Sequence, residues 1–301
     1  MKNLDVKSTL TTDEALEIAE QMQRIALGAL YRSGPLSPAN SVFHGGGAIR
    51  LAWASSRLSE DLDFLVNASL ESDLERGVEV ARTEIEQRMN SLTPGCTISL
   101  TRKKDLGTGT QRYLLRWYHP NRMGKVAVKL EFSIVRDEKL AQYPREVLFP
   151  GDPRLSPYEM RASISVPKPA TSIADKLIAF AMREEIKWRD VYDLWFLSHT
   201  HRSWDDDRGH ETLRAAVTSI AQIYNYEIDT VADRLDARAA TVEATPIGDI
   251  AREIGRFLPR EARDQMNVPG IWEDLRVKAC EHARLAAADL RSLPPSMGST
   301  P

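Results

Sequence analysis

The sequence predicts an α+β fold in which a domain built on a mixed β-sheet is followed by an all-α domain. Short apolar and alternating segments, typical of strands, occur before about residue 165. From about residue 172 to Arg291, apolar residues recur every three or four positions, which is typical of packed helices. We predict a sheet-based domain over residues 1–165, a helical domain over residues 166–291 and a disordered tail over residues 292–301.

Composition and charge exclude several classes of protein. The 301-residue chain is 42% hydrophobic and 28% charged, as in ordinary globular proteins. No apolar run of about 18 residues and no secretory signal is present, so we expect a cytoplasmic protein without a membrane segment. Cys96 and Cys280 lie far apart and predict neither a disulfide framework nor a zinc site. The net charge of −3 carries no overall signature of nucleic-acid binding.

The first elements are predicted to be a helix, a short strand and a second helix. Residues 13–31 carry apolar side chains at helical spacing, and Thr12 is the expected N-cap. Residues 41–44 form an apolar run that ends in Gly45-Gly46-Gly47. A further periodic segment follows over residues 48–55, so the expected order is strand, glycine turn, helix.

Four further segments are predicted to be strands, and they are residues 62–66, 97–102, 111–118 and 125–135. A charged surface helix is expected over residues 70–90. The last strand alternates, with apolar residues on one face and Lys125, Lys129 and Glu131 on the other. A turn at residues 121–124 makes a hairpin of the last two strands, and the proline-rich stretch 149–169 marks the domain junction.

Two carboxylates, Asp61 and Asp63, lie two residues apart at the start of a predicted strand. Their side chains therefore point to the same face. Two such carboxylates repel each other unless a cation lies between them. Magnesium prefers oxygen ligands, usually one or two carboxylates together with phosphates and water. The pattern indicates a site for Mg²⁺, or Mn²⁺, that also holds a nucleoside triphosphate (NTP).

Two neighbouring features support this site. Gly46 and Gly47 leave backbone N–H groups open at a helix N-terminus, where negative charge is favoured. Glu131 lies in an alternating strand that could neighbour the strand of Asp61 and Asp63, which makes it a natural third metal ligand. Three carboxylates could hold two metals, one activating the attacking hydroxyl and one neutralising pyrophosphate. Each feature alone is weak evidence: a glycine turn before a helix is usually structural, a bare D-x-D is at least as often a solvated strand end, and Glu131 could simply face water. Their order along the chain favours the functional interpretation.

In these segments the sequence resembles the AbiEii/AbiGii toxin family of nucleotidyltransferases, within the polymerase β superfamily. The matching segments are HGGGAIRL at 44–51, RLSEDLDF at 57–64, VKLEF at 128–132, DKLIA at 175–179 and KWRDVYDL at 187–194. The resemblance covers roughly residues 40–200 and implies a polymerase β-like nucleotidyltransferase domain followed by helices. The third acid is often Asp in this superfamily and is Glu131 here, so its carboxylate is displaced by about one methylene.

The resemblance implies a role for each matching residue. Asp61 and Asp63 would bind metal, and Gly46, Gly47, Arg57 and Ser59 would line the nucleotide site. Lys176 would contact the triphosphate held at the aspartates, in a site between the domains, and Asp193 would be an essential acid. The alternative for the last two residues is an ordinary helical hairpin with surface ion pairs, in which Arg189 pairs with Asp193.

The resemblance also implies a function. Family members are toxins of toxin–antitoxin or phage-defence systems, and those understood transfer a nucleotide from an NTP to an acceptor such as a tRNA 3′ end. We therefore expect an NTP, an RNA acceptor and a cognate antitoxin as partners. Two alternatives stay open: transfer to a protein hydroxyl, and a non-catalytic nucleotide-binding module. Basic residues on the predicted sheet, including Arg112 and Lys129, could face a polynucleotide or simply be solvated.

Overall fold

The computed structural model describes residues 8–104, 109–150, 152–153, 162–201 and 207–292. By internal contacts the chain forms two compact units. The first comprises Met1–Ala54, Ser59–Ala141 and Glu146–Val166, and the second Ser55–Leu58, Gln142–Arg145 and Pro167–Pro301. A single boundary at residue 165, as predicted from sequence, leaves Ser55–Leu58 and Gln142–Arg145 on the side of the first unit, although they belong to the second. The tail predicted to be disordered lies, apart from Ser292, outside the described residues.

The first unit begins with helix α1, Thr12–Arg32. Its N-cap is Thr11 and not the predicted Thr12, because Thr11 forms a capping box with Glu14. The Glu14 N–H donates to Thr11 Oγ1 at 3.2 Å, and the Thr11 N–H donates to the Glu14 carboxylate at 2.8 Å. Both side chains thereby satisfy N–H groups that a helix N-terminus otherwise leaves unpaired.

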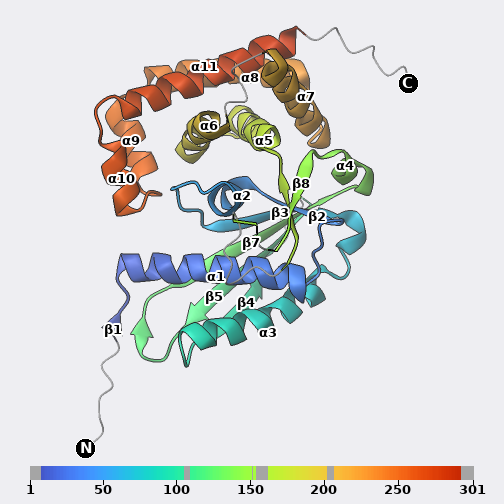
Figure 1. Cartoon of the computed structure of the whole chain (residues 1–301), viewed down its shortest axis with the longest axis vertical. Helices are drawn as coiled ribbons and strands as arrows, with labels where there is room; N and C mark the ends of the chain where they lie inside the picture. The colour runs from blue at the N-terminus through green and yellow to red at the C-terminus, as the bar shows by residue number, and fades with distance from the viewer. Residues whose placement is uncertain (1–7, 105–108, 151, 154–161, 202–206, 293–301) are drawn as a thin grey trace, which may run out of the picture. The chain divides into compact units, whose positions relative to one another are not determined.

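A five-stranded mixed sheet forms the centre of this unit, with the strand order β2-β3-β7-β5-β4 (Figure 1). In that order the strands are Ser41–His44, Asp61–Asn67, Val126–Val135, Thr110–Tyr118 and Thr97–Arg102. The neighbours β3 and β7 are parallel, and the other pairs are antiparallel. All predicted strands are confirmed, as is the hairpin that pairs β5 with β7. A separate pair joins β1, Ser8–Thr9, to β6, Arg122–Met123.

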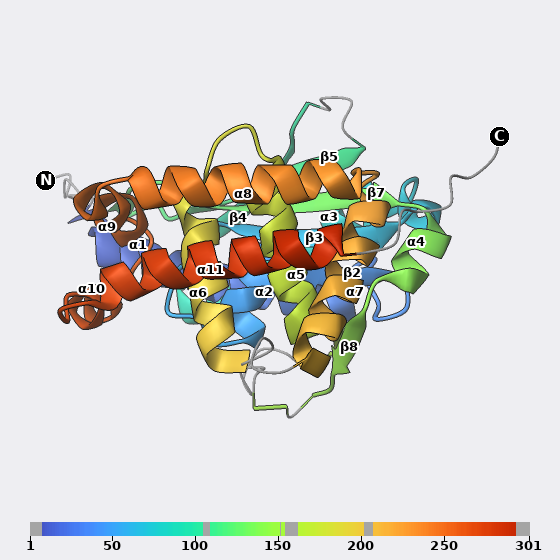
Figure 2. The same ribbon diagram turned by 90° about the horizontal axis from the view of Figure 1, so that it is seen from above.

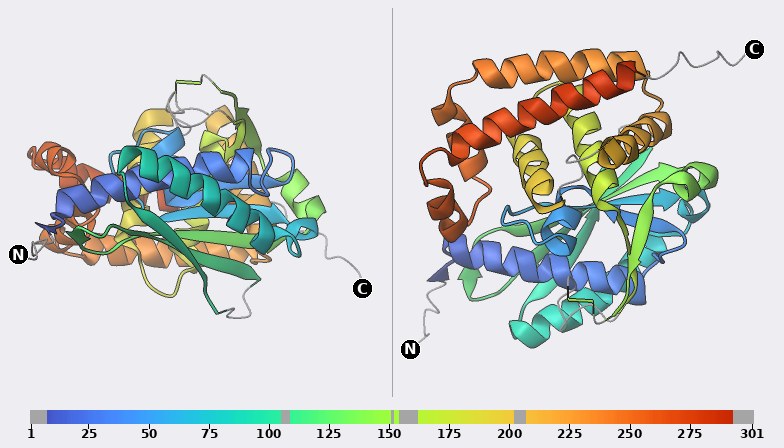
Figure 3. Two further views of the ribbon diagram at one scale, coloured as in Figure 1. Left: turned by 90° about the horizontal axis from the view of Figure 1, so that it is seen from below. Right: turned by 45° about the horizontal axis from the view of Figure 1, so that its top comes forward.

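Helices α1 and α3, Leu74–Leu92, lie on one face of the sheet (Figures 1 and 3). Aromatic rings from neighbouring strands fill that side: Phe64 stacks on Phe132 at 5.1 Å, and Tyr113 meets Phe132 edge-on at 5.8 Å. Because strand side chains alternate, the polar residues of β3 and β7 occupy the opposite face. The predicted helix over residues 70–90 starts later, since Ala68–Leu70 forms a separate 3-10 turn, η1.

The glycines do not form the predicted turn between β2 and a later helix. Helix α2, Gly45–Ala52, starts within them, directly after His44. Downstream, α4 is Asp137–Gln142 and the pair β8 and β9 is Arg145–Leu148 with Ile164–Pro167. The stretch predicted to be irregular therefore contains a strand, and much of the rest lies outside the described residues.

From Pro169 onward the described part of the second unit is helical, as predicted. Its helices α5 to α11 are Pro169–Met182, Trp188–His201, Asp207–Ile223, Ile228–Ala244, Ile247–Gly255, Arg260–Met266 and Ile271–Arg291. The long helices α8 and α11 run side by side, and α5 packs against α6, α7 and α8 (Figure 2). Pro169 stands in the first turn of α5, where a missing N–H costs nothing. Among all the residues that the structure describes, no helix is long and apolar enough to cross a membrane.

Candidate active site

The predicted carboxylates lie on adjacent strands. In the parallel register of β3 and β7, Asp63 is opposite Glu131 and Asp61 is opposite Lys129. This confirms the expectation that the strand of Glu131 neighbours the strand of Asp61 and Asp63. All four side chains are on the sheet face opposite the aromatic core, and the side chains of Asp61 and Glu131 are 15% and 30% exposed. The arrangement concentrates negative charge on one half-buried patch.

Two cations of the same sheet face neutralise part of this charge. Lys129 Nζ lies 3.0 Å from Asp61 Oδ1, and Arg112 Nε lies 3.4 Å from Glu131 Oε1. Arg112 on β5 is the register partner of Glu131. Across the described residues, no three His, Cys, Asp or Glu side chains converge as a metal-binding group. In this arrangement Asp61 and Glu131 each face a basic side chain.

The charge state of Lys129 follows from these neighbours. Partial burial alone lowers the pKa of a lysine, because it disfavours the ammonium form. Here the hydrogen bond and negative charge of Asp61, together with the charges of Glu60 and Glu131, outweigh burial and hold the pKa of Lys129 above its ordinary value. Lys129 is therefore a full positive charge at neutral pH.

The glycines at the start of α2 are required by close packing against β3. Gly45 has a φ of +71°, and a Cβ there would lie 2.5 Å from Asp63 Oδ2. A Cβ on Gly47 would lie 2.8 Å from the carbonyl oxygen of Asp61. Gly46 stands between them in the first turn of α2. Only glycine allows this backbone to approach the carboxylate strand so closely, and a helix start has N–H groups without intrahelical partners.

Ser59 lies just before β3 and is half-buried. Its hydroxyl donates to the backbone carbonyl of Asp61 at 3.3 Å. Its own carbonyl accepts a hydrogen bond of 2.6 Å from Nε2 of Gln23, a buried residue of α1. The segment that leads into the carboxylate strand is thus attached to α1.

A second charge cluster lies in the second unit and is buried. Arg57 donates through Nε and Nη2 to the two carboxylate oxygens of Asp193, each at 2.8 Å, and through Nη1 to the Leu58 carbonyl at 2.8 Å. Lys176 Nζ lies 2.8 Å from Asp193 and 3.0 Å from Asp190. The two aspartates are fully buried, and Arg57 and Lys176 nearly so. Arg183 also contacts Asp190 from a more exposed position.

Burial and pairing act in opposite directions on these groups. Burial alone raises the pKa of Asp193, but the Arg57 guanidinium and the Lys176 ammonium outweigh it and hold the pKa below its ordinary value. Burial lowers the pKa of Lys176, yet Asp193 and Asp190 hold it above its ordinary value. Both groups are ionised at neutral pH, so the cluster is a network of buried ion pairs.

This burial overturns the alternative of a hairpin with surface ion pairs. The expected partner of Asp193 was Arg189, whereas the described contacts of its carboxylate are with Arg57 and Lys176. Sequence reasoning missed the pairing of Arg57 with Asp193 because the two residues are 136 positions apart and no local spacing links them. The contacts of Lys176 and Arg57 with a nucleotide stay predictions.

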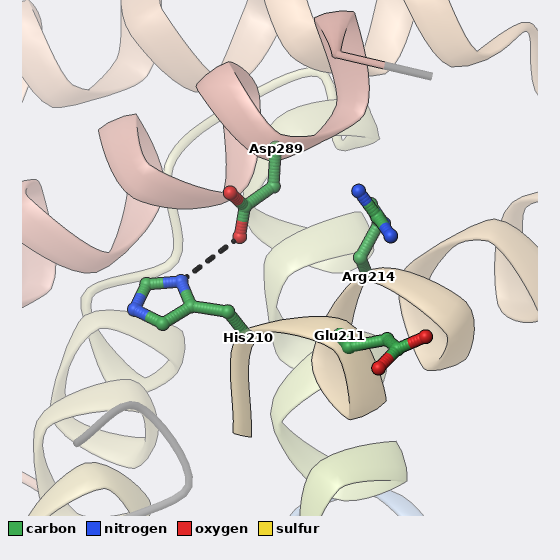
Figure 4. Close-up of a pocket in the computed structure, with 4 residues that line it drawn as sticks. All are labelled: His210, Glu211, Arg214 and Asp289. Carbon is green, nitrogen blue, oxygen red and sulfur yellow. Dashed lines mark hydrogen bonds and ion pairs between the residues drawn. The ribbon is translucent and has the colours of Figure 1, made fainter. Parts of the chain in front are cut away.

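A pocket of about 520 Å³ opens elsewhere in the second unit (Figure 4). Residues of α7 and α11 line it, namely His210, Glu211, Arg214 and Asp289. His210 Nδ1 lies 3.1 Å from Asp289 Oδ2. None of these residues belongs to the predicted site, and their positions along the chain follow no recognisable motif.

Comparison with known proteins decides the family. The sequence matches the family model described as nucleotidyl transferase AbiEii toxin, type IV toxin–antitoxin system, over residues 28–274. The chain belongs to the AbiEii family. The AbiEii proteins are nucleotidyltransferase toxins, so membership implies a transferase, an NTP substrate and an antitoxin partner. No curated protein matches the sequence.

Solved structures confirm the predicted fold for this AbiEii protein. A candidate nucleotidyltransferase from Helicobacter pylori is 21% identical, with a TM-score of 0.53 over 95% of this chain and 99% of that one. JHP933 from Helicobacter pylori is 20% identical, with a TM-score of 0.51 over 94% and 95%. The nucleotidyltransferase toxin MenT4 from Mycobacterium tuberculosis is 18% identical, with a TM-score of 0.51 over 95% and 91%. At these identities the likeness extends to the fold alone.

Proposed function

We propose that this AbiEii protein transfers a nucleoside monophosphate from an NTP to an RNA acceptor, and that the 3′ end of tRNA is the first acceptor to test. The observation that carries the proposal is the arrangement of Asp61, Asp63 and Glu131 on one face of two neighbouring strands, beside the start of α2. Family membership supplies the reaction class. The setting is a toxin–antitoxin or phage-defence system with a cognate antitoxin.

The carboxylate patch fits a divalent metal such as Mg²⁺ or Mn²⁺ by its chemistry. Carboxylate oxygens are the ligands that these ions prefer, and only glycine at position 45 avoids placing a side-chain carbon 2.5 Å from Asp63 Oδ2. Asp61 and Asp63 would hold the metal, and Glu131 would join them on release from Arg112. When bound, the metal would neutralise phosphate charge and favour ionisation of the attacking hydroxyl.

The protein's own groups would bind and orient the triphosphate. The N–H groups at Gly46 and Gly47 and the dipole of α2 favour an anion at this helix start. Ser59 would line the same region, fixed by its hydrogen bonds to Asp61 and Gln23. Orienting the substrate for in-line attack on the α-phosphate and stabilising the developing charge are the contributions that these groups would make.

For the second cluster we propose a supporting role. Asp193 keeps Arg57 and Lys176 ionised and in place through bidentate and single ion pairs. Arg57 lies four residues before Asp61 in the chain, so its anchoring would restrain the start of the segment that leads to Asp61. Asp193 would then be a positioning residue, while Lys176 stays a predicted phosphate contact.

Transfer of labelled α-phosphate from each of the four NTPs to total tRNA tests the proposal. We expect label on tRNA with magnesium, none with EDTA, and a loss on the order of 10²-fold or more in Asp63→Asn, the scale of losing one group that stabilises transition-state charge. Asp137→Asn, at an exposed position of α4, is the matched control and should label normally. Label that resists RNase and is lost with protease would instead indicate a protein acceptor. NTP binding without any transfer would indicate a non-catalytic module.

A further inference from the structure

We infer that Lys129 is a built-in counter-ion of the carboxylate patch, which gives way to the divalent metal and then binds the triphosphate. This inference rests on the proposed function of that patch. The sequence presents Lys129 only as one of several basic residues on a strand, and its position opposite Asp61 is a property of the β3–β7 register.

The first step is that the patch requires a cation of some kind. Asp61, Asp63 and Glu131 lie on two adjacent strands, and three like charges on one half-buried patch repel one another. In the structure the cation opposite Asp61 comes from the chain itself, at 3.0 Å. Asp61, Glu60 and Glu131 all act on the Lys129 ammonium with their negative charge. Lys129 therefore supplies, opposite Asp61, positive charge that the patch requires.

The second step is that this cation is easily exchanged. The side chain of Lys129 is 51% exposed, whereas that of Asp61 is only 15% exposed. The ammonium therefore approaches the carboxylate from the solvent side, on a flexible four-carbon stem. An exposed, monodentate lysine pair contributes little free energy, because solvent screens it and ordering the stem costs entropy. A divalent ion with several oxygen ligands outcompetes such a pair.

The third step concerns where the ammonium goes. Its Cα is fixed in the middle of β7, between Leu130 and Val128, whose side chains are buried in the core. The released ammonium consequently stays beside the patch, where the triphosphate of the substrate would bring three or four negative charges. Lysine binds phosphate as a mobile point charge. Lys129 thus balances the charge of the carboxylates before metal binds, and contacts the triphosphate after metal and substrate have bound.

Metal and triphosphate binding test the two halves separately, without any transfer reaction. Free Mn²⁺ is measured by electron paramagnetic resonance for the wild type, Lys129→Met and Lys129→Arg. Removing the competing charge should tighten Mn²⁺ binding about two- to fivefold, the fold-change that corresponds to an exposed ion pair. Lys129→Arg keeps the charge and should bind Mn²⁺ as the wild type does. Lys125→Met, four residues earlier and exposed, is the matched control and should change nothing.

The second measurement is the binding of inorganic triphosphate at saturating Mn²⁺, followed by calorimetry. Inorganic triphosphate carries no nucleobase, so its affinity does not depend on which NTP the protein prefers. Lys129→Met should weaken it several-fold, while Lys125→Met should not. Unchanged or weaker Mn²⁺ binding in Lys129→Met overturns the counter-ion role, and unchanged triphosphate binding overturns the phosphate contact. Tighter Mn²⁺ binding in a protein that labels no RNA would leave this inference standing and refute the RNA acceptor. If the wild type labels tRNA but Lys129→Met changes neither Mn²⁺ binding nor triphosphate binding, the RNA acceptor would stand and this inference would be refuted.

Discussion

The two charge clusters of this protein use the same chemical groups in opposite ways. On the sheet, Asp61 and Glu131 each meet one partly exposed cation, at 3.0 and 3.4 Å. In the second unit, Asp193 is fully buried and meets a guanidinium through two hydrogen bonds of 2.8 Å and an ammonium as well, both of them nearly buried. Exposed pairs contribute roughly 0–1 kcal/mol, whereas breaking a buried pair costs about 3–5 kcal/mol. Burial therefore distinguishes a patch whose ion pairs are readily broken from a network whose ion pairs are costly to break.

The largest effect is expected at the buried network. Asp193→Asn keeps the shape of the side chain but leaves Arg57 and Lys176 without their shared negative charge. We expect the free energy of unfolding to fall by about 3–5 kcal/mol, measured by urea unfolding monitored by circular dichroism. Asp233→Asn is the matched control, because Asp233 also pairs with an arginine, Arg291, but is 77% exposed. Similar losses for the two variants would refute the distinction between the clusters.

A smaller effect is expected on the acid side of the stability profile. The pKa of Asp193 is lower in the folded protein than the value of about 3.9 for an unfolded chain. The group therefore contributes stability above about pH 4, and this contribution is lost as the pH falls through the folded pKa. Urea unfolding between pH 7 and 3 should show a steeper decline for the wild type than for Asp193→Asn. Parallel profiles would mean that Asp193 is not stabilised by its cations.

The smallest effect on stability is expected at the exchangeable patch. Asp61→Asn removes the partner of Lys129 but also relieves repulsion with Asp63 and Glu131. We expect the free energy of unfolding to change by no more than about 1 kcal/mol, and this change to shrink further in 1 M salt, where exposed charges are screened. A loss of several kcal/mol that persists in high salt would place Asp61 among the structural charges instead.

Local pattern was enough to predict most of the fold. The strand over residues 97–102 has the bounds of β4, and the alternation of residues 125–135 identified both the strand and its core face. Local pattern was wrong where competing contacts decided an end: Thr11 caps α1 because Glu14 reciprocates, and the glycines enter α2 because they pack against β3. Element ends depend on a few hydrogen bonds, whereas periodicity is summed over a whole segment.

The sequence by itself determined which residues are chemically suited to a site: Asp61, Asp63 and Glu131 follow from strand periodicity and from the ligand preference of divalent metals. Only the tertiary structure decided their partners. The parallel register of β3 and β7 puts Lys129 opposite Asp61, and helix packing buries Asp193 against Arg57, 136 residues away. Periodicity acts between near neighbours in the chain, whereas ion pairs between distant segments depend on register and burial, which no local spacing encodes.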